Sequence, residues 1–265
     1  MYLRELADYY REEGLAEELA SARVCQDIVL KAIADGPLSN NVTIKGGVVM
    51  RSITGDNRRS TRDIDLDFIH YSLNDDSIRQ FVKKLNCIEG LSIDIEGGIK
   101  ELKHQDYNGK SIGIIIKDEQ GITIRSKMDL GVHKHMEIEQ EEYCFDVCID
   151  DEGATLLKNT KEQSFVEKLR SLLIFGPNSR RYRDIFDLYY LKDVVDQEKL
   201  REVLDVLILK DNGIRESSME DIIKRVTGTF KDRQYLRRVS DSRQRWIDDD
   251  MQIIADGIVD FLRRL

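Results

Sequence analysis

Three aspartates at alternate positions, Asp63, Asp65 and Asp67, are the residues of this sequence best suited to chemistry. They lie in DIDLDFI, whose alternation of polar and apolar residues predicts a half-buried strand over 63–69. Asp63 and Asp65 then project side by side from one face, where like charges disfavour folding unless a cation shares them. Mg²⁺ prefers oxygen ligands of this kind, and two such ions can clamp a phosphoryl transfer. The alternative is a solvent-facing strand with polar residues at every second position.

A glycine pair upstream of these acids could approach the phosphates of a nucleotide. Lys45-Gly46-Gly47 follows a predicted strand, Val42–Ile44, and precedes a predicted helix, Val48–Ile53. Glycines at such a junction let the backbone come close to a phosphate, and the amides of the helix face it. Arginines between the two motifs could take triphosphate charge or be solvated loop residues: Arg51, Arg58, Arg59 and Arg62.

A third carboxylate is expected on a neighbouring strand. Asp129, in IRSKMDL, follows a plausible strand and would bind one metal and lower the pKa of an attacking hydroxyl. Asp146, in the next strand, is the rival, and Asp67 is expected to be a supporting acid.

The rest of the sequence predicts the helices and strands that must position these side chains. Up to residue 150, helices are expected over 1–35 (stopped by Gly36-Pro37) and 75–86 (N-cap Asn74), and further strands over 91–95, 111–116, 122–132 and 143–149. Turn signals at Asn108-Gly109 and Asp118–Gly121 favour antiparallel neighbours. After residue 150, helices are expected over 152–158, 162–175, 182–194, 197–209, 218–226, 231–238 and 245–264. This order predicts an α+β domain with N-terminal helices over 1–150 and a helical domain over 151–265.

Composition limits the class of protein. The 265 residues are 41% hydrophobic and 34% charged, which is typical of a soluble globular protein. No apolar run is long enough to cross a bilayer, the N-terminus lacks a signal peptide, and the four cysteines form no CxxC pair, so we expect a cytoplasmic protein without membrane contact. The net charge of −9 argues against a protein that coats nucleic acid, although segments 56–62, 180–183 and 224–245 are locally basic.

Two motifs together resemble a known family. Lys45-Gly46-Gly47 with the stretch RSTRDIDLD over 59–67 looks like the AbiEii group of the polymerase-β-like nucleotidyltransferase superfamily, which comprises abortive-infection and toxin–antitoxin toxins. The stretches EKLRSLL over 167–173 and RDIFDLYYL over 183–191 resemble the helical signature of that group. The resemblance covers roughly residues 42–192.

The resemblance implies a mixed polymerase-β-like sheet with flanking helices, followed by a helical C-terminal lobe across the active-site cleft. It implies Mg²⁺, with Mn²⁺ as an alternative, a nucleoside triphosphate as substrate, an acceptor such as the 3′ end of tRNA, and a cognate antitoxin as partner. Asp63, Asp65 and Asp129 would be the metal ligands and, with Lys168, the catalytic residues. The residues expected to bind the nucleotide are Lys45, Gly46, Gly47, Arg59, Ser60, Thr61, Lys168 and Asp187.

Several alternatives stay open at this point. Lys168 could grip a triphosphate or snorkel to the surface, and Asp184 and Asp187, which share a helical face, could instead pair with it and hold two helices in register. The basic residues around Trp246 could form an RNA footprint or a solvated surface. The same chemistry could also modify a small molecule or a protein, and a catalytically inactive relative could act as a binding partner.

Overall fold

The chain divides into a sheet unit and a helical unit, which meet in the sequence between Asn159 and Thr160. The computed structural model describes residues 2–102 and 109–265, so Asn108 of the expected Asn108-Gly109 turn lies outside the described residues. The sheet unit runs past residue 150, the boundary expected from the sequence, because 152–158 is not a helix. Ala154–Lys158 forms strand β7, whose alternating burial places Ala154, Leu156 and Lys158 inside.

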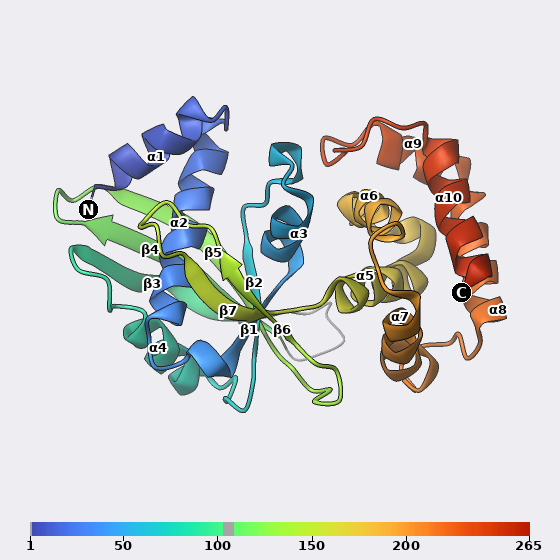
Figure 1. Ribbon diagram of the computed structural model, residues 1–265, viewed down its shortest axis with the longest axis horizontal. Helices are drawn as coiled ribbons and strands as arrows, with labels where there is room; N and C mark the ends of the chain where they lie inside the picture. Colours follow the sequence, from blue (N-terminus) through green and yellow to red (C-terminus); the bar gives the residue numbers. More distant parts are fainter. Residues whose placement is uncertain (1, 103–108) are drawn as a thin grey trace. The chain divides into compact units, whose positions relative to one another are not determined.

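The sheet has seven strands in the order β3-β4-β5-β2-β1-β7-β6 (Figure 1). The strands are β1 Val42–Lys45, β2 Ile64–Phe68, β3 Leu91–Glu101, β4 Lys110–Asp118, β5 Thr123–Val132, β6 Glu141–Phe145 and β7 Ala154–Lys158. β2 pairs with β5, and β1 with β7, in parallel, whereas the other neighbours are antiparallel. The expected α+β class with a mixed sheet is therefore confirmed, as are the antiparallel neighbours around Asp118–Gly121.

Helices cover the sheet on its apolar face. The first 35 residues form two helices rather than one, α1 (Leu3–Glu12) and α2 (Glu17–Ala34), because Gly14 between them has a positive φ of 92°. α2 contacts both β5 and β7, so it crosses the middle of the sheet (Figure 1). The other helices of this unit are α3 Gly46–Thr54, α4 Asp75–Lys84, and 3₁₀ turns at Ser39–Asn41 and Asn57–Arg59. Asn74 caps α4 as expected, accepting a hydrogen bond from the Ser77 amide.

Apolar residues and aspartates alternate along β2, so they lie on opposite faces of the strand. Ile64, Leu66 and Phe68 are fully buried in the main apolar cluster. The side chains at the alternate positions of a strand point to the opposite face, so the aspartates of β2 are kept away from that cluster.

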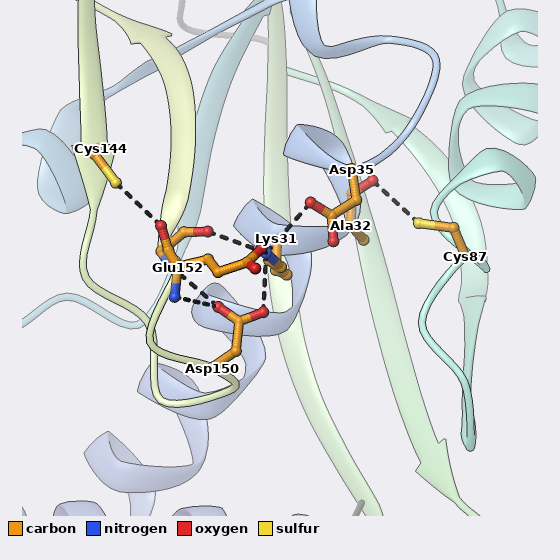
Figure 2. A network of polar contacts seen from close by, with 8 residues as sticks. Lys31, Ala32, Asp35, Cys87, Cys144, Asp150 and Glu152 are labelled. Carbon is orange, nitrogen blue, oxygen red and sulfur yellow. Dashed lines mark hydrogen bonds and ion pairs between the residues drawn. The ribbon is translucent and has the colours of Figure 1, made fainter.

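Lys31 of α2 is a buried cation that ties this helix to the turn before β7 (Figure 2). Its ammonium lies 2.9 Å from the Asp150 carboxylate and 3.3 Å from that of Asp35, and it donates to the Gly153 carbonyl. Asp150 also accepts hydrogen bonds from the amides of Glu152 and Gly153. The hydrogen bond from Lys31 is the main cause that lowers the pKa of Asp150 below its ordinary 3.8.

We expect Asp150→Asn to destabilise the protein near neutral pH, by about 1 kcal/mol or less because Asp150 is partly exposed. A carboxylate whose folded-state pKa is depressed stabilises the fold fully above pH 3.8, and that stabilisation is lost as the pH falls through the folded-state pKa. Urea unfolding should therefore show a gap between wild type and variant at pH 7 that closes in acid. Asp151→Asn, one residue away and exposed, is the control, and an equal loss there would contradict the prediction.

The helical unit packs around α5, most of whose residues are buried. Its helices are α5 Lys161–Phe175, α6 Tyr182–Leu191, α7 Gln197–Leu204, α8 Met219–Phe230, α9 Arg233–Ser240 and α10 Met251–Arg264, with a 3₁₀ turn at Gly176–Asn178 and a π-helical segment at Asp205–Leu209. α10 starts at Met251 rather than at residue 245, because Asp250 caps it and Arg245 donates to the backbone carbonyls of the irregular segment before it. None of the helices in the described part of the chain is both long and apolar enough to span a membrane.

Candidate functional site

The strand register brings Asp65 and Asp129 together. β2 and β5 run parallel, and Asp65 lies directly opposite Asp129 in their ladder. Asp63 immediately precedes β2 and shares the face of Asp65. Asp146 is exposed beyond the end of β6, which β1 and β7 separate from β2. The structure therefore places Asp129, and not its rival Asp146, beside the acidic pair.

Lys127 is a further charged residue at this cluster, and sequence reasoning did not single it out. Two positions before Asp129 on β5, it shares the face of that carboxylate. Its ammonium lies 2.7 Å from Asp129 Oδ2 and 3.7 Å from Asp63 Oδ2. In residues 2–102 and 109–265, no three His, Cys, Asp or Glu side chains are gathered tightly enough to hold a metal ion as they stand. A cation of the chain thus balances the carboxylates here.

The donor set nevertheless fits a divalent metal. Burial is the main cause that raises the pKa of Asp65, the nearby charges of Asp129 and Asp63 raise it further, and Lys45 and the Gly47 amide act in the opposite sense. Asp129 Oδ1 is buried and accepts no hydrogen bond from any residue that the structure describes. Crowded carboxylates with a buried, unused acceptor oxygen are the hard oxygen ligands that Mg²⁺ and Mn²⁺ take up.

The Gly46-Gly47 turn touches the acidic cluster directly. Gly46 adopts a left-handed φ of 65°, and a side chain there would overlap the carboxylate of Asp65. A side chain at Gly47 would overlap Thr61. The Gly47 amide, at the start of α3, faces Asp65 Oδ2 at 3.5 Å. The backbone of the turn and the catalytic candidates are therefore in contact, as a phosphate-binding turn beside a metal site requires.

Lys45 lies one residue before the turn and forms an ion pair with Asp67. The two groups are 2.6 Å apart and mostly buried, and a side chain at Gly131 would overlap Asp67. Asp67 therefore pairs with a neighbour of the turn, which is the kind of supporting position expected for it. It also gives the Lys45 ammonium a position from which it lowers the pKa of Asp65.

The loop between α3 and β2 holds the other expected nucleotide-binding residues. Arg59 and Ser60 are buried, and the Ser60 hydroxyl donates to the Asn57 carbonyl. Thr61 is half-buried, and its carbonyl accepts a hydrogen bond of 2.8 Å from Gln26 of α2. Gln26 was not predicted from the sequence, although a glutamine in an otherwise apolar stretch of helix is a signal that could have found it.

Lys168 of α5 belongs to a separate polar cluster inside the helical unit. Its ammonium lies 3.1 Å from the Asp184 carboxylate and 2.8 Å from that of Asp187 on α6. Asp187 is fully buried and also accepts a hydrogen bond of 3.0 Å from the Trp246 indole. This is the pairing that the sequence left open as a structural role, and it holds α5, α6 and the segment before α10 together.

Some of the basic residues around Trp246 have partners within the helical unit. Arg225 donates to the Leu173 carbonyl, and Arg238 to the Pro177 carbonyl. Arg245 donates to the carbonyls that precede α10. These three arginines stabilise the unit, so an RNA footprint here would depend on exposed residues such as Lys231 and Arg243.

Acidic residues on a strand, beside a glycine turn that opens a helix, are the arrangement expected of a nucleotidyltransferase. A solved structure described as an antigenic nucleotidyltransferase-like protein from Paracoccidioides brasiliensis matches with a TM-score of 0.50 at 13% identity, over 83% of this chain and 91% of that chain, a likeness of fold. The model of the AbiEii family, described as nucleotidyl transferase toxins of type IV toxin–antitoxin systems, matches residues 28–261. The chain belongs to this family, as the two sequence motifs had predicted. A search of curated proteins gave no match.

Proposed function

We propose that this chain transfers a nucleotide from a nucleoside triphosphate to an acceptor hydroxyl with the help of Mg²⁺, or Mn²⁺ in its place. The observation that carries the proposal is the position of Asp65, which lies opposite Asp129 on the neighbouring strand and against the Gly46-Gly47 turn. The glycine backbone and the α3 amides would hold the triphosphate, and Asp63, Asp65 and Asp129 would bind the metal.

In the reaction, the acceptor oxygen forms a bond to the α-phosphorus, the bond between the α- and β-phosphates breaks, and pyrophosphate leaves. The bound metal would supply charge stabilisation for the phosphoryl group and lower the pKa of the hydroxyl. Asp129 would help to activate the hydroxyl and would accept its proton. Lys45, Arg59, Ser60 and Thr61 would shape the phosphate side of the site.

The family suggests the kind of partner, and the acceptor is part of our proposal. An AbiEii toxin of a type IV toxin–antitoxin system implies a cognate antitoxin. We propose the 3′ end of tRNA as the acceptor, with the exposed basic residues of the 224–245 segment contributing phosphate contacts. We propose the cytoplasm as the compartment, since these substrates are found there.

The test is to incubate the purified protein with Mg²⁺, total bacterial RNA and each labelled nucleoside triphosphate in turn. Label is expected in a tRNA-sized band with wild type, and it should be lost with EDTA and in Asp63→Asn. Full activity in Asp63→Asn would overturn the metal assignment. Label in protein or in small molecules would replace the acceptor, and a chain that neither transfers nor binds a nucleotide would overturn the proposal.

A further inference from the structure

Helix α2 carries three polar residues into the interior of the sheet unit. Gln26 and Asp27 are fully buried and Lys31 nearly so, on a helix otherwise buried through Ala, Val, Ile and Leu. Buried polar groups are costly unless each finds a partner. Asp27 accepts hydrogen bonds from the Tyr10 hydroxyl and the Cys148 amide, and Lys31 binds the turn at Asp150 (Figure 2). Both of these residues serve segments away from the acidic cluster.

Gln26 differs from them because its partners flank the glycine turn. Its amide nitrogen donates to the Thr61 carbonyl at 2.8 Å, and its amide oxygen accepts from Arg51 of α3. Arg51 lies on the helix that Gly46 and Gly47 begin, and Thr61 lies in the loop that packs on Gly47. One buried side chain thus joins the helix and the loop that together form the phosphate side of the site.

The close contact between Thr61 and Gly47 fixes the spacing between the loop and the glycine turn. The side chain of Thr61 fills the space that a Cβ at position 47 would need, so the loop and the turn have a fixed spacing. On another side the same loop borders a cavity of about 300 Å³, lined in part by Asn57, Ser60 and Thr61. Packing on that side is incomplete, so hydrogen bonds hold the loop. Gln26 donates to the Thr61 carbonyl, and the Ser126 hydroxyl of β5 donates to the Arg62 carbonyl.

We infer that Gln26 is a positioning residue for nucleotide binding, which sets the distance between the 57–62 loop and the Gly46-Gly47 turn before the triphosphate arrives. This inference rests on the proposed function and deepens it. A preorganised loop binds with less loss of conformational entropy, so the effect should appear in the affinity for the nucleotide rather than in the chemical step.

The sharp variant is Gln26→Glu. It keeps the size of the side chain and an acceptor for Arg51, now charged, but it removes the donor to Thr61 and sets a carboxylate oxygen against that carbonyl. Gln26→Met, which removes both bonds, is the second variant. Lys31→Met is the matched control, because it removes the polar contacts of a buried residue of the same helix that reaches the Asp150 turn instead (Figure 2).

Two measurements on the full-length chain test the inference. Amide hydrogen exchange without nucleotide should be faster in the 57–62 segment of Gln26→Glu and Gln26→Met, and unchanged there in Lys31→Met. In the transfer assay, the KM for the triphosphate should rise about tenfold in both Gln26 variants, while kcat changes less than about threefold. Gln26→Glu reports on the loop even if Gln26→Met unfolds.

The outcomes are distinct. Wild-type exchange in the 57–62 segment of Gln26→Glu, an unchanged KM, or equal effects in Lys31→Met would overturn the positioning role. Absence of transfer and of nucleotide binding in the wild type would instead overturn the proposed function. The exchange measurement would still show whether Gln26 orders the loop, because it needs no turnover.

Discussion

Replacing Asp65 by asparagine is expected to abolish nucleotide transfer and to leave the folded chain at least as stable as before. Asp65 lies between the Gly47 amide and Asp129, so it joins the Gly46-Gly47 turn to the other proposed metal ligands. Loss of a ligand of the proposed metal would remove the charge stabilisation that the metal gives the transition state, which lowers kcat by about 10²–10³-fold or more. The transfer assay at saturating triphosphate measures this loss.

The stability half of this prediction follows from electrostatics. Burial and the charges of Asp129 and Asp63 raise the pKa of Asp65, so in the absence of metal its ionised form opposes folding at neutral pH. Asparagine removes that charge with the same shape. The thermal unfolding midpoint without divalent ions should be equal to or higher than that of wild type.

Asp67→Asn provides the matched comparison on the same strand. It is the same chemical change two residues away, but it breaks the buried ion pair with Lys45, and it should lower the midpoint. An Asp65→Asn variant that transfers nucleotides at the wild-type rate, or that unfolds as readily as Asp67→Asn, would contradict this assignment.

Gly46→Ala should lower transfer by about 10²-fold, because displacing a catalytic group by about 1 Å can have an effect of that size. The added methyl group would overlap the Asp65 carboxylate and push it away from Asp129. The left-handed φ of 65° adds strain of about 1–2 kcal/mol for any residue with a side chain. The measurements are the rate of transfer and the free energy of unfolding.

Gly55→Ala separates the two effects. Gly55, at the C-terminal end of α3, has nearly the same φ of 63°, but a Cβ there would meet no atom within 4 Å. Both variants should therefore lose stability, and only Gly46→Ala should lose activity. If Gly55→Ala loses activity to the same degree, backbone strain rather than the approach to Asp65 is the cause.

The acidic cluster could be predicted from the sequence because its signals are local. The alternation in DIDLDFI identifies β2 and the shared face of its aspartates, and the glycine pair marks the start of α3. The choice between Asp129 and Asp146 was not local, since it depends on which strand lies beside β2. Only the parallel β2–β5 register shows that Asp129, rather than Asp146, lies beside Asp65.

Other parts of the site and fold could not be predicted because they, too, depend on contacts between residues far apart in the sequence. Gln26 has no motif of its own, and its importance appears only when Arg51 and Thr61 meet it. The 152–158 segment was expected to be the first of the amphipathic helices after residue 150. Pairing with β1 and β6 makes it a strand, a tertiary influence that outweighs local propensity.

The position of β7 in the sheet has a consequence for how the chain is made. β1 is an interior strand, but one of its two neighbours, β7, is the last strand to leave the ribosome. Until β7 is synthesised, the free edge of β1, next to the strand that carries Asp65, is open to wrong partners. The sheet is thus completed late, through contacts between residues distant in sequence, which slows folding. The strand between β1 and β6 is therefore the last part of the sheet to be put in place, after the residues of the six other strands have been made.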